Sequence, residues 1–72
     1  MRINLNADMA EGFGAYDIGD DTSLLGIVAS ANIACGFHGG DPSVMRRVML
    51  AAEKAGVSLG AHPGFNDLWG FG

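Results

Sequence analysis

Six ionisable side chains follow three segments in which apolar and polar residues alternate, and their types suit acid–base and metal chemistry. They are Asp8 and Glu11 after the first segment, His38 and Asp41 after the second, and His62 and Asp67 after the third. Carboxylates and imidazoles transfer protons in enzymes, and both ligate divalent cations. Because such chemistry needs several groups at one reacting centre, the elements before them must deliver these side chains to the same place.

The stretch from Ala31 to Pro42 shows how the chain could position such groups. A small, apolar run suited to a buried strand leads into a glycine-rich turn that contains His38. Asp41 then precedes Pro42, the pattern of a helix cap followed by proline in the first helical position. Asp41 is therefore open to two interpretations, a structural cap and a functional carboxylate.

Metal binding and nucleophilic chemistry are further possibilities at these positions. Asp8, His38 and His62 have the types of an open divalent-metal site, with one carboxylate, two imidazoles and room for water. Cys35 could be a nucleophile, although small buried cysteines are commonly inert. The FHGGD turn lacks the Lys and Ser/Thr of a Walker motif, so it gives no independent sign of nucleotide binding.

Strands and helices are predicted to alternate around these residues. The strands are expected at 2–8, 30–34 and 57–62, where the period is two, and the helices at 22–29 and 42–55. The second helix has apolar residues at three- and four-residue spacings, and Gly56 ends it. Asp20 or Asp21 would cap the first helix.

The order strand, helix, strand, helix, strand predicts an α/β fold with parallel strands, because the connections are too long for tight hairpins. Each strand has a polar second face, which a sheet covered by helices on both sides does not show. We therefore expect the N-terminal βαβαβ part of a TIM-like (β/α) barrel with a polar lumen. Such a barrel has about eight strands, so residues 1–72 are predicted to be a single partial domain of a larger chain.

The composition excludes several other classes of protein. With 49% hydrophobic and 17% charged residues, the chain is typical of a folded protein. Its net charge of −4 and its four Lys and Arg residues argue against a nucleic-acid partner. No apolar run approaches the ~20 residues of a membrane span, and the N-terminus has no signal-peptide core. We therefore expect a cytoplasmic protein without a membrane partner.

Three segments in order, LNADMAEGFG, SANIACGFHGGDP and GAHPGFNDLWGFG, resemble the N-terminal part of the LamB/YcsF proteins, the family of the 5-oxoprolinase A subunit. The resemblance spans all 72 residues. It implies a β/α barrel of the type related to polysaccharide deacetylases, in a cytoplasmic protein that works with two further subunits, B and C. The assembly would cleave the lactam of 5-oxoproline to glutamate, with ATP as co-substrate.

The family motifs also imply which residues form the site. They fall on Asn6, Asp8, Glu11, Asn32, His38, Asp41, His62 and Asp67. We interpret Asp8, Glu11, His38 and His62 as catalytic candidates, and Asn6, Asn32, Asp41 and Asp67 as substrate-binding candidates. Ala10 stands where the family usually has glycine, Gly39 where alanine is common and Asn66 where proline is frequent. These departures bear on loop rigidity more than on chemistry.

Three functions follow from these residues. In the ATP-dependent lactam reaction, Asp8 or His38 would act as base or orient water, and His62 would donate to the oxyanion or the leaving nitrogen. A metal-dependent amide or acetyl hydrolase would instead use Asp8, His38 and His62 as ligands and need no ATP. A carbohydrate- or small-molecule-binding module, or a scaffold subunit, would only position substrate for its partners.

Overall fold

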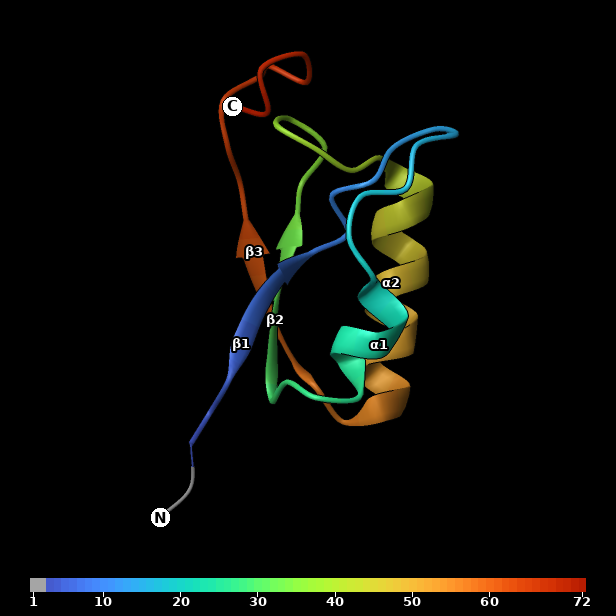
Figure 1. Ribbon diagram of the computed structural model, residues 1–72, viewed down its shortest axis with the longest axis vertical. Coiled ribbons are helices and arrows are strands. Elements are labelled where there is room, and N and C mark those ends of the chain that lie inside the picture. The colour runs from blue at the N-terminus through green and yellow to red at the C-terminus, as the bar shows by residue number, and fades with distance from the viewer. Residues whose placement is uncertain (1–2) are drawn as a thin grey trace.

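The structure, a computed structural model, describes residues 3–72 and contains a three-stranded parallel sheet (Figure 1). The elements are β1 (Asn6–Met9), α1 (Asp21–Leu25), β2 (Ser30–Ala34), α2 (Pro42–Ala55) and β3 (Ser58–His62). Their order in the sheet is β1-β2-β3, and both neighbouring pairs are parallel. The predicted alternation of strands and helices and the parallel pairing are confirmed.

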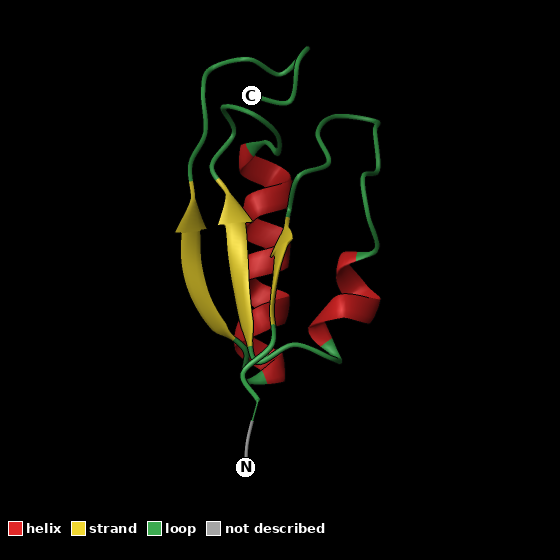
Figure 2. Cartoon of the chain, turned by 60° about the vertical axis from the view of Figure 1, so that its left-hand side comes forward, coloured by secondary structure: helices red, strands yellow, loops and turns green. Residues whose placement is uncertain are grey.

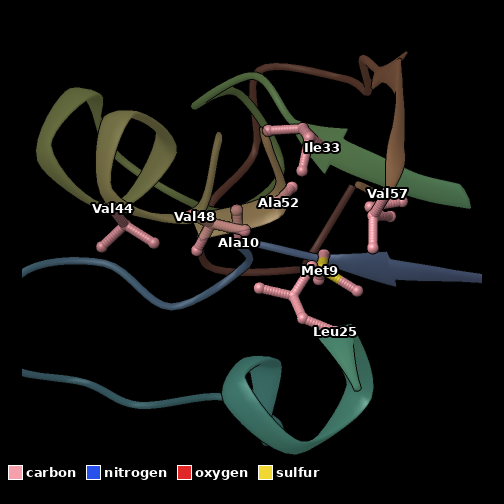
Figure 3. Close-up of a cluster of buried hydrophobic side chains, with 9 residues drawn as sticks. Met9, Ala10, Leu25, Ile33, Val44, Val48, Ala52 and Val57 are labelled. Atoms are coloured by element: carbon pink, nitrogen blue, oxygen red, sulfur yellow. The ribbon is translucent and has the colours of Figure 1, made fainter. Parts of the chain in front are cut away.

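The two helices lie on the same side of the sheet, with α2 packed across it and α1 next to α2 (Figures 1 and 2). Apolar side chains from the sheet and both helices meet between these layers (Figure 3). Met9 and Ile33 come from the strands, Leu25 from α1, and Val44 and Val48 from α2. No helix in the part of the chain from residue 3 onward combines the length and apolar character needed to cross a membrane.

Helix α2 has the ends that the sequence predicts. The Asp41 carboxylate accepts a hydrogen bond from the Val44 amide at 2.8 Å, and Pro42 occupies the first turn. Gly56 ends the helix in the left-handed conformation, with φ of 72°. The buried stripe consists of Val44, Val48 and Ala52, so it is narrower than expected, and Ala51 and Ala55 are exposed.

Helix α1 is shorter than predicted. It covers Asp21–Leu25 instead of 22–29, and of its two candidate caps Asp20 is the one that accepts from the Ser23 amide, at 3.3 Å. The N–H of Gly26 turns back to the carbonyl of Ser23 at 3.2 Å, which closes the last turn. Ile27, which lies within the predicted helix, follows the observed one and is 66% exposed.

Strand β1 begins at Asn6, later than predicted, because its partner β2 reaches back only to Ser30. Asn6 pairs with Ser30, the first residue of β2, so the preceding residues have no strand beside them. Leu5 instead accepts hydrogen bonds at its carbonyl from the amides of Ala29 and Ser30. Of the predicted strand 2–8, residue 2 lies outside the described residues. Strand β3 starts at Ser58, one residue later than predicted.

The loops that follow β1 and β2 are joined backbone to backbone. The N–H of Gly40 donates to the carbonyl of Glu11 at 2.9 Å. Gly40 has φ of 79°, and a Cβ at this position would collide with the carbonyl oxygen of Ala10. Ala10 is itself fully buried with φ of 62°, a conformation that glycine adopts more readily. Glycine at position 40 is therefore required both by its φ and by the close approach of the two loops.

We predict that Gly40→Ala lowers the free energy of unfolding by about 2–4 kcal/mol. Left-handed alanine costs about 1 kcal/mol, and overpacking adds about 1–3 kcal/mol. Gly19→Ala is the matched control, because Gly19 has φ of 81° but no atom would lie within 4 Å of an added Cβ. The control should lose only about 1 kcal/mol. Urea unfolding of the complete protein measures both values, and equal losses would contradict the proposed collision.

Candidate functional site

The loops after the three strands gather at one end of the sheet (Figure 2). Residues of these loops and of the strand ends line a small pocket there. Its volume is about 250 Å³. The four residues predicted to be catalytic, Asp8, Glu11, His38 and His62, all line it. They come from three separate loops or strand ends, as expected for parallel strands whose carboxyl ends lie at the same edge. The structure therefore brings these four side chains together.

Glu11 and His38 form the tightest pair in the pocket. Nε2 of His38 lies 2.9 Å from Oε2 of Glu11, and His38 is only 5% exposed. The backbone of Gly64 lies directly against the imidazole, since a Cβ there would come within 2.6 Å of Nδ1 of His38. Phe71 packs its ring edgewise against the same imidazole, with centroids 5.3 Å apart. His38 is thus held from several sides, and its Nε2 is directed at a carboxylate.

His62, the last residue of β3, lies at the rim of the pocket with one nitrogen facing two carboxylates. Its Nδ1 is 3.6 Å from Oδ1 of Asp8 and 3.9 Å from Oε2 of Glu11. Its ring lies 4.7 Å from that of His38. Nδ1 is buried and has no hydrogen-bond partner among the described residues. A lone pair there would be repelled by the carboxylates, so the space between this nitrogen and the two carboxylates suits a hydrogen or a cation.

Asn6 and Asn32 lie on the polar face of the sheet next to the pocket. The Asn32 amide donates to Oδ1 of Asn6 at 3.0 Å and to Oδ1 of Asp8 at 3.2 Å. Asp8 and Asn32 are partners in the parallel register, so the sheet itself creates this contact. Asn32 therefore orients the carboxylate of Asp8, and neither amide side chain lines the pocket.

Asp41 and Asp67 are placed outside the pocket. Asp41 uses one carboxylate oxygen for the Val44 amide and the other for the Gly14 amide, at 2.7 Å. These hydrogen bonds lower the pKa of Asp41 because they stabilise its charged form. Asp67 accepts from the Gly70 amide at 2.9 Å in a C-terminal turn. Both carboxylates organise loops, and the cap interpretation of Asp41 accounts for its contacts.

Two features of the site were not anticipated from the sequence. Asp21 accepts a hydrogen bond from the Ala10 amide at 3.2 Å, which ties α1 to the loop just before Glu11. Burial raises the pKa of Asp21. Gly64 and Phe71 contact His38, although they were assigned no role. The glycine that follows Pro63 is a sequence feature that permits another group to approach the backbone closely. No feature of the neighbouring sequence indicates the contact between Asp21 and Ala10.

Glu11, His38 and His62 form a group that could hold a metal ion. Each offers one ligand atom, and these atoms all lie within 4.8 Å of one another. Asp8, the carboxylate expected from the sequence, lies beside His62 but outside this group, and Glu11 takes its place. Cys35 is not part of it, and its thiol lies 3.5 Å from the Ile33 carbonyl.

Comparison with known proteins finds relatives that carry the same name. The model of the LamB/YcsF family matches residues 3–72. The 5-oxoprolinase A subunit of Azoarcus sp. (strain BH72) is 64% identical over 72 residues, covering 100% of this chain and 28% of the relative. That of Ruegeria pomeroyi is 63% identical over 71 residues, covering 99% of this chain and 28% of the relative. The chain spans less than a third of the length of these curated relatives.

A solved structure shares the fold of the whole chain. The crystal structure of a lactam utilization protein from Thermus thermophilus superposes with a TM-score of 0.96 at 50% sequence identity. The match covers 100% of this chain and 29% of that one. The three-stranded sheet and its helices are therefore a portion of a larger fold in that protein.

We predict that Asp41→Asn lowers the free energy of unfolding at neutral pH, and that the difference between the variant and the wild type becomes smaller in acid. Asparagine can still cap α2, but its amide group cannot accept the Gly14 N–H in place of the second carboxylate oxygen. Because the folded-state pKa of Asp41 is lowered from 3.8, its contribution is present above that pH and is lost as the pH falls through the lowered value. Urea midpoints from about pH 2 to pH 7 measure this. A difference that stays constant with pH would contradict it.

Proposed function

The chain belongs to the LamB/YcsF family, and we propose that it supplies part of the acid–base site of a 5-oxoprolinase A subunit. The proposed reaction is hydrolysis of the lactam of 5-oxoproline to glutamate. The names of the relatives and of the Thermus thermophilus protein support the substrate class. The observation that carries the proposal is the convergence of Asp8, Glu11, His38 and His62 on one pocket.

The chemistry of the lactam sets the tasks of these residues. Water adds to the carbonyl carbon after losing a proton to a base, and the ring C–N bond breaks as the nitrogen gains a proton. The products are the carboxylate and the amine of glutamate. A lactam is a weak electrophile, so a positioned base, a donor for the oxyanion and an acid for the nitrogen each lower the barrier.

We assign the base to Asp8 and the donor to His62. The side chain of Asp8 is 54% exposed and Asn32 orients it, so a water molecule can reach it. The imidazole of His62 lines the pocket and can donate a ring N–H to substrate. Glu11 and His38 form the buried pair behind this residue, and Oε2 of Glu11 lies 3.9 Å from Nδ1 of His62.

The ATP of the proposed reaction does not fit the described residues. Within residues 3–72 the basic side chains Arg46, Arg47 and Lys54 lie on α2, and none lines the pocket. The Val44 amide at the start of α2 is already bonded to Asp41. We therefore assign ATP to another part of the assembly, either the remainder of a longer chain or the partner subunits B and C.

We further propose that the polar face of the sheet lines the lumen of a complete β/α barrel. The row of Asn6, Asn32 and Asp8 on that face supports this, because such a row is unsuited to an apolar helix interface. The relatives are named as one subunit of 5-oxoprolinase, which implies that they work in multi-subunit complexes. A cytoplasmic location is consistent with an unpaired Cys35.

We predict that His62→Ala lowers turnover at least about 100-fold in the complete protein assayed with its partner subunits. The measurement is ATP-dependent release of glutamate from 5-oxoproline. Ser58→Ala is the matched control, since Ser58 is exposed on the same strand but far from the pocket end. It should stay within about 2-fold of the wild-type rate.

Near-normal turnover of His62→Ala and Glu11→Gln would contradict the catalytic assignment and favour a scaffold role. An equal loss in Ser58→Ala would instead indicate damage to the strand. If the intact protein releases glutamate in the absence of ATP, the ATP-dependent reaction is contradicted and simple amide hydrolysis is favoured.

A further inference from the structure

We propose that Glu11, His38 and His62 form a binding site for one divalent transition-metal ion, with zinc as the best match. The ligand atoms are Oε2 of Glu11, Nε2 of His38 and Nδ1 of His62. The separations are 2.9 Å from Glu11 to His38 and 3.9 Å from Glu11 to His62, and each of the three residues offers a ligand atom within 4.8 Å of the others. This site does not depend on the lactam reaction.

The spacing suits a small ion after minor adjustment. Zinc binds nitrogen and oxygen ligands at about 2.0–2.2 Å, which puts tetrahedral ligands roughly 3.3–3.6 Å apart. The observed distance of 2.9 Å between Glu11 and His38 would have to lengthen by less than an ångström. The distance of 3.9 Å between Glu11 and His62 would have to shorten, also by less than an ångström. Three protein ligands leave a position open toward the pocket, which is the arrangement of catalytic zinc sites.

The nitrogen of His62 provides a separate reason to place a cation here. Its Nδ1 is buried, has no hydrogen-bond partner among the described residues, and faces the oxygens of Glu11 and Asp8. A buried polar atom without a partner is costly, and a lone pair directed at carboxylates is repelled. A divalent cation among these three residues would satisfy the nitrogen and neutralise the carboxylate together.

The surroundings hold two of the ligands in place before any ion arrives. The backbone carbonyl of Glu11 is bonded to the Gly40 amide, and Gly64 and Phe71 enclose the ring of His38. Less conformational entropy is then lost on binding. His62 is enclosed less than the other two ligands, because its side chain is 33% exposed at the rim.

The ligand set selects the class of ion. Two imidazoles and one carboxylate favour zinc and its neighbours in the first transition row, whereas calcium and magnesium prefer oxygen ligands. Asp8 lies 3.6 Å from Nδ1 of His62 but is not part of the group of ligand atoms that lie within 4.8 Å of one another, so its charge acts on the site from outside. When bound, the ion would supply a Lewis acid at the open position.

Metal titration of the complete protein tests the site. After removal of metals with a chelator, Zn²⁺ is added in a calorimeter, and Co²⁺ is added with its visible absorption recorded. Glu11→Gln should lose one equivalent of bound metal or weaken its affinity at least about 100-fold, and Asp8→Asn should weaken it no more than about 10-fold. His62→Ala should match Glu11→Gln.

The comparison of the two carboxylates decides the outcome. Loss of the metal in Asp8→Asn but not in Glu11→Gln would overturn the assignment of Glu11, and absence of an equivalent of metal in the wild type would overturn the site. Far-UV circular dichroism of each metal-free variant controls for folding. If Glu11→Gln does not fold, the rim variant His62→Ala decides, because its side chain is only partly buried. Glutamate release by a wild-type protein that binds no metal would overturn this site and leave the proposed function standing, whereas metal binding without glutamate release would do the opposite.

Discussion

The hydrogen bond from the Gly40 amide to the Glu11 carbonyl is the contact on which the site depends. It brings the loop after β1 onto the turn after β2, and glycine is needed because the Ala10 carbonyl lies where a Cβ would project. The same loop is tied at a second point, where the Gly14 amide bonds to Asp41. The first attachment joins two backbone groups and the second joins a backbone amide to the Asp41 carboxylate, so the position of Glu11 beside His38 depends on how closely the two loops approach.

The two faces of the sheet divide stability from chemistry. The face toward the helices carries Met9 and Ile33, which pack into the apolar cluster with α2. The opposite face carries Asn32 and Asp8, whose side chains bond to each other across the parallel register. Because successive residues of a strand point to opposite faces, a single short strand supplies both the core and the approach to the pocket.

Prediction from the sequence succeeded where the signal is local. Helix α2 begins and ends as expected because Asp41, Pro42 and Gly56 act on their immediate neighbours. Strand β1 and helix α1 were predicted too long, since the start of β1 depends on where β2 begins and the end of α1 on one turn at Gly26. The ends of both elements are set by backbone contacts with other residues, which the alternation of residue types does not reveal.

The sequence by itself determined the order of the elements, the parallel α/β class and the four side chains that meet at the pocket, because period and capping are properties of neighbouring residues. Only the tertiary structure decided that Glu11, rather than Asp8, groups with the two histidines. It also assigned Asp41 and Asp67 to loop organisation. The physical reason is that distances between loops depend on how strands pair and how backbones approach, which residue types and spacings along one chain do not specify.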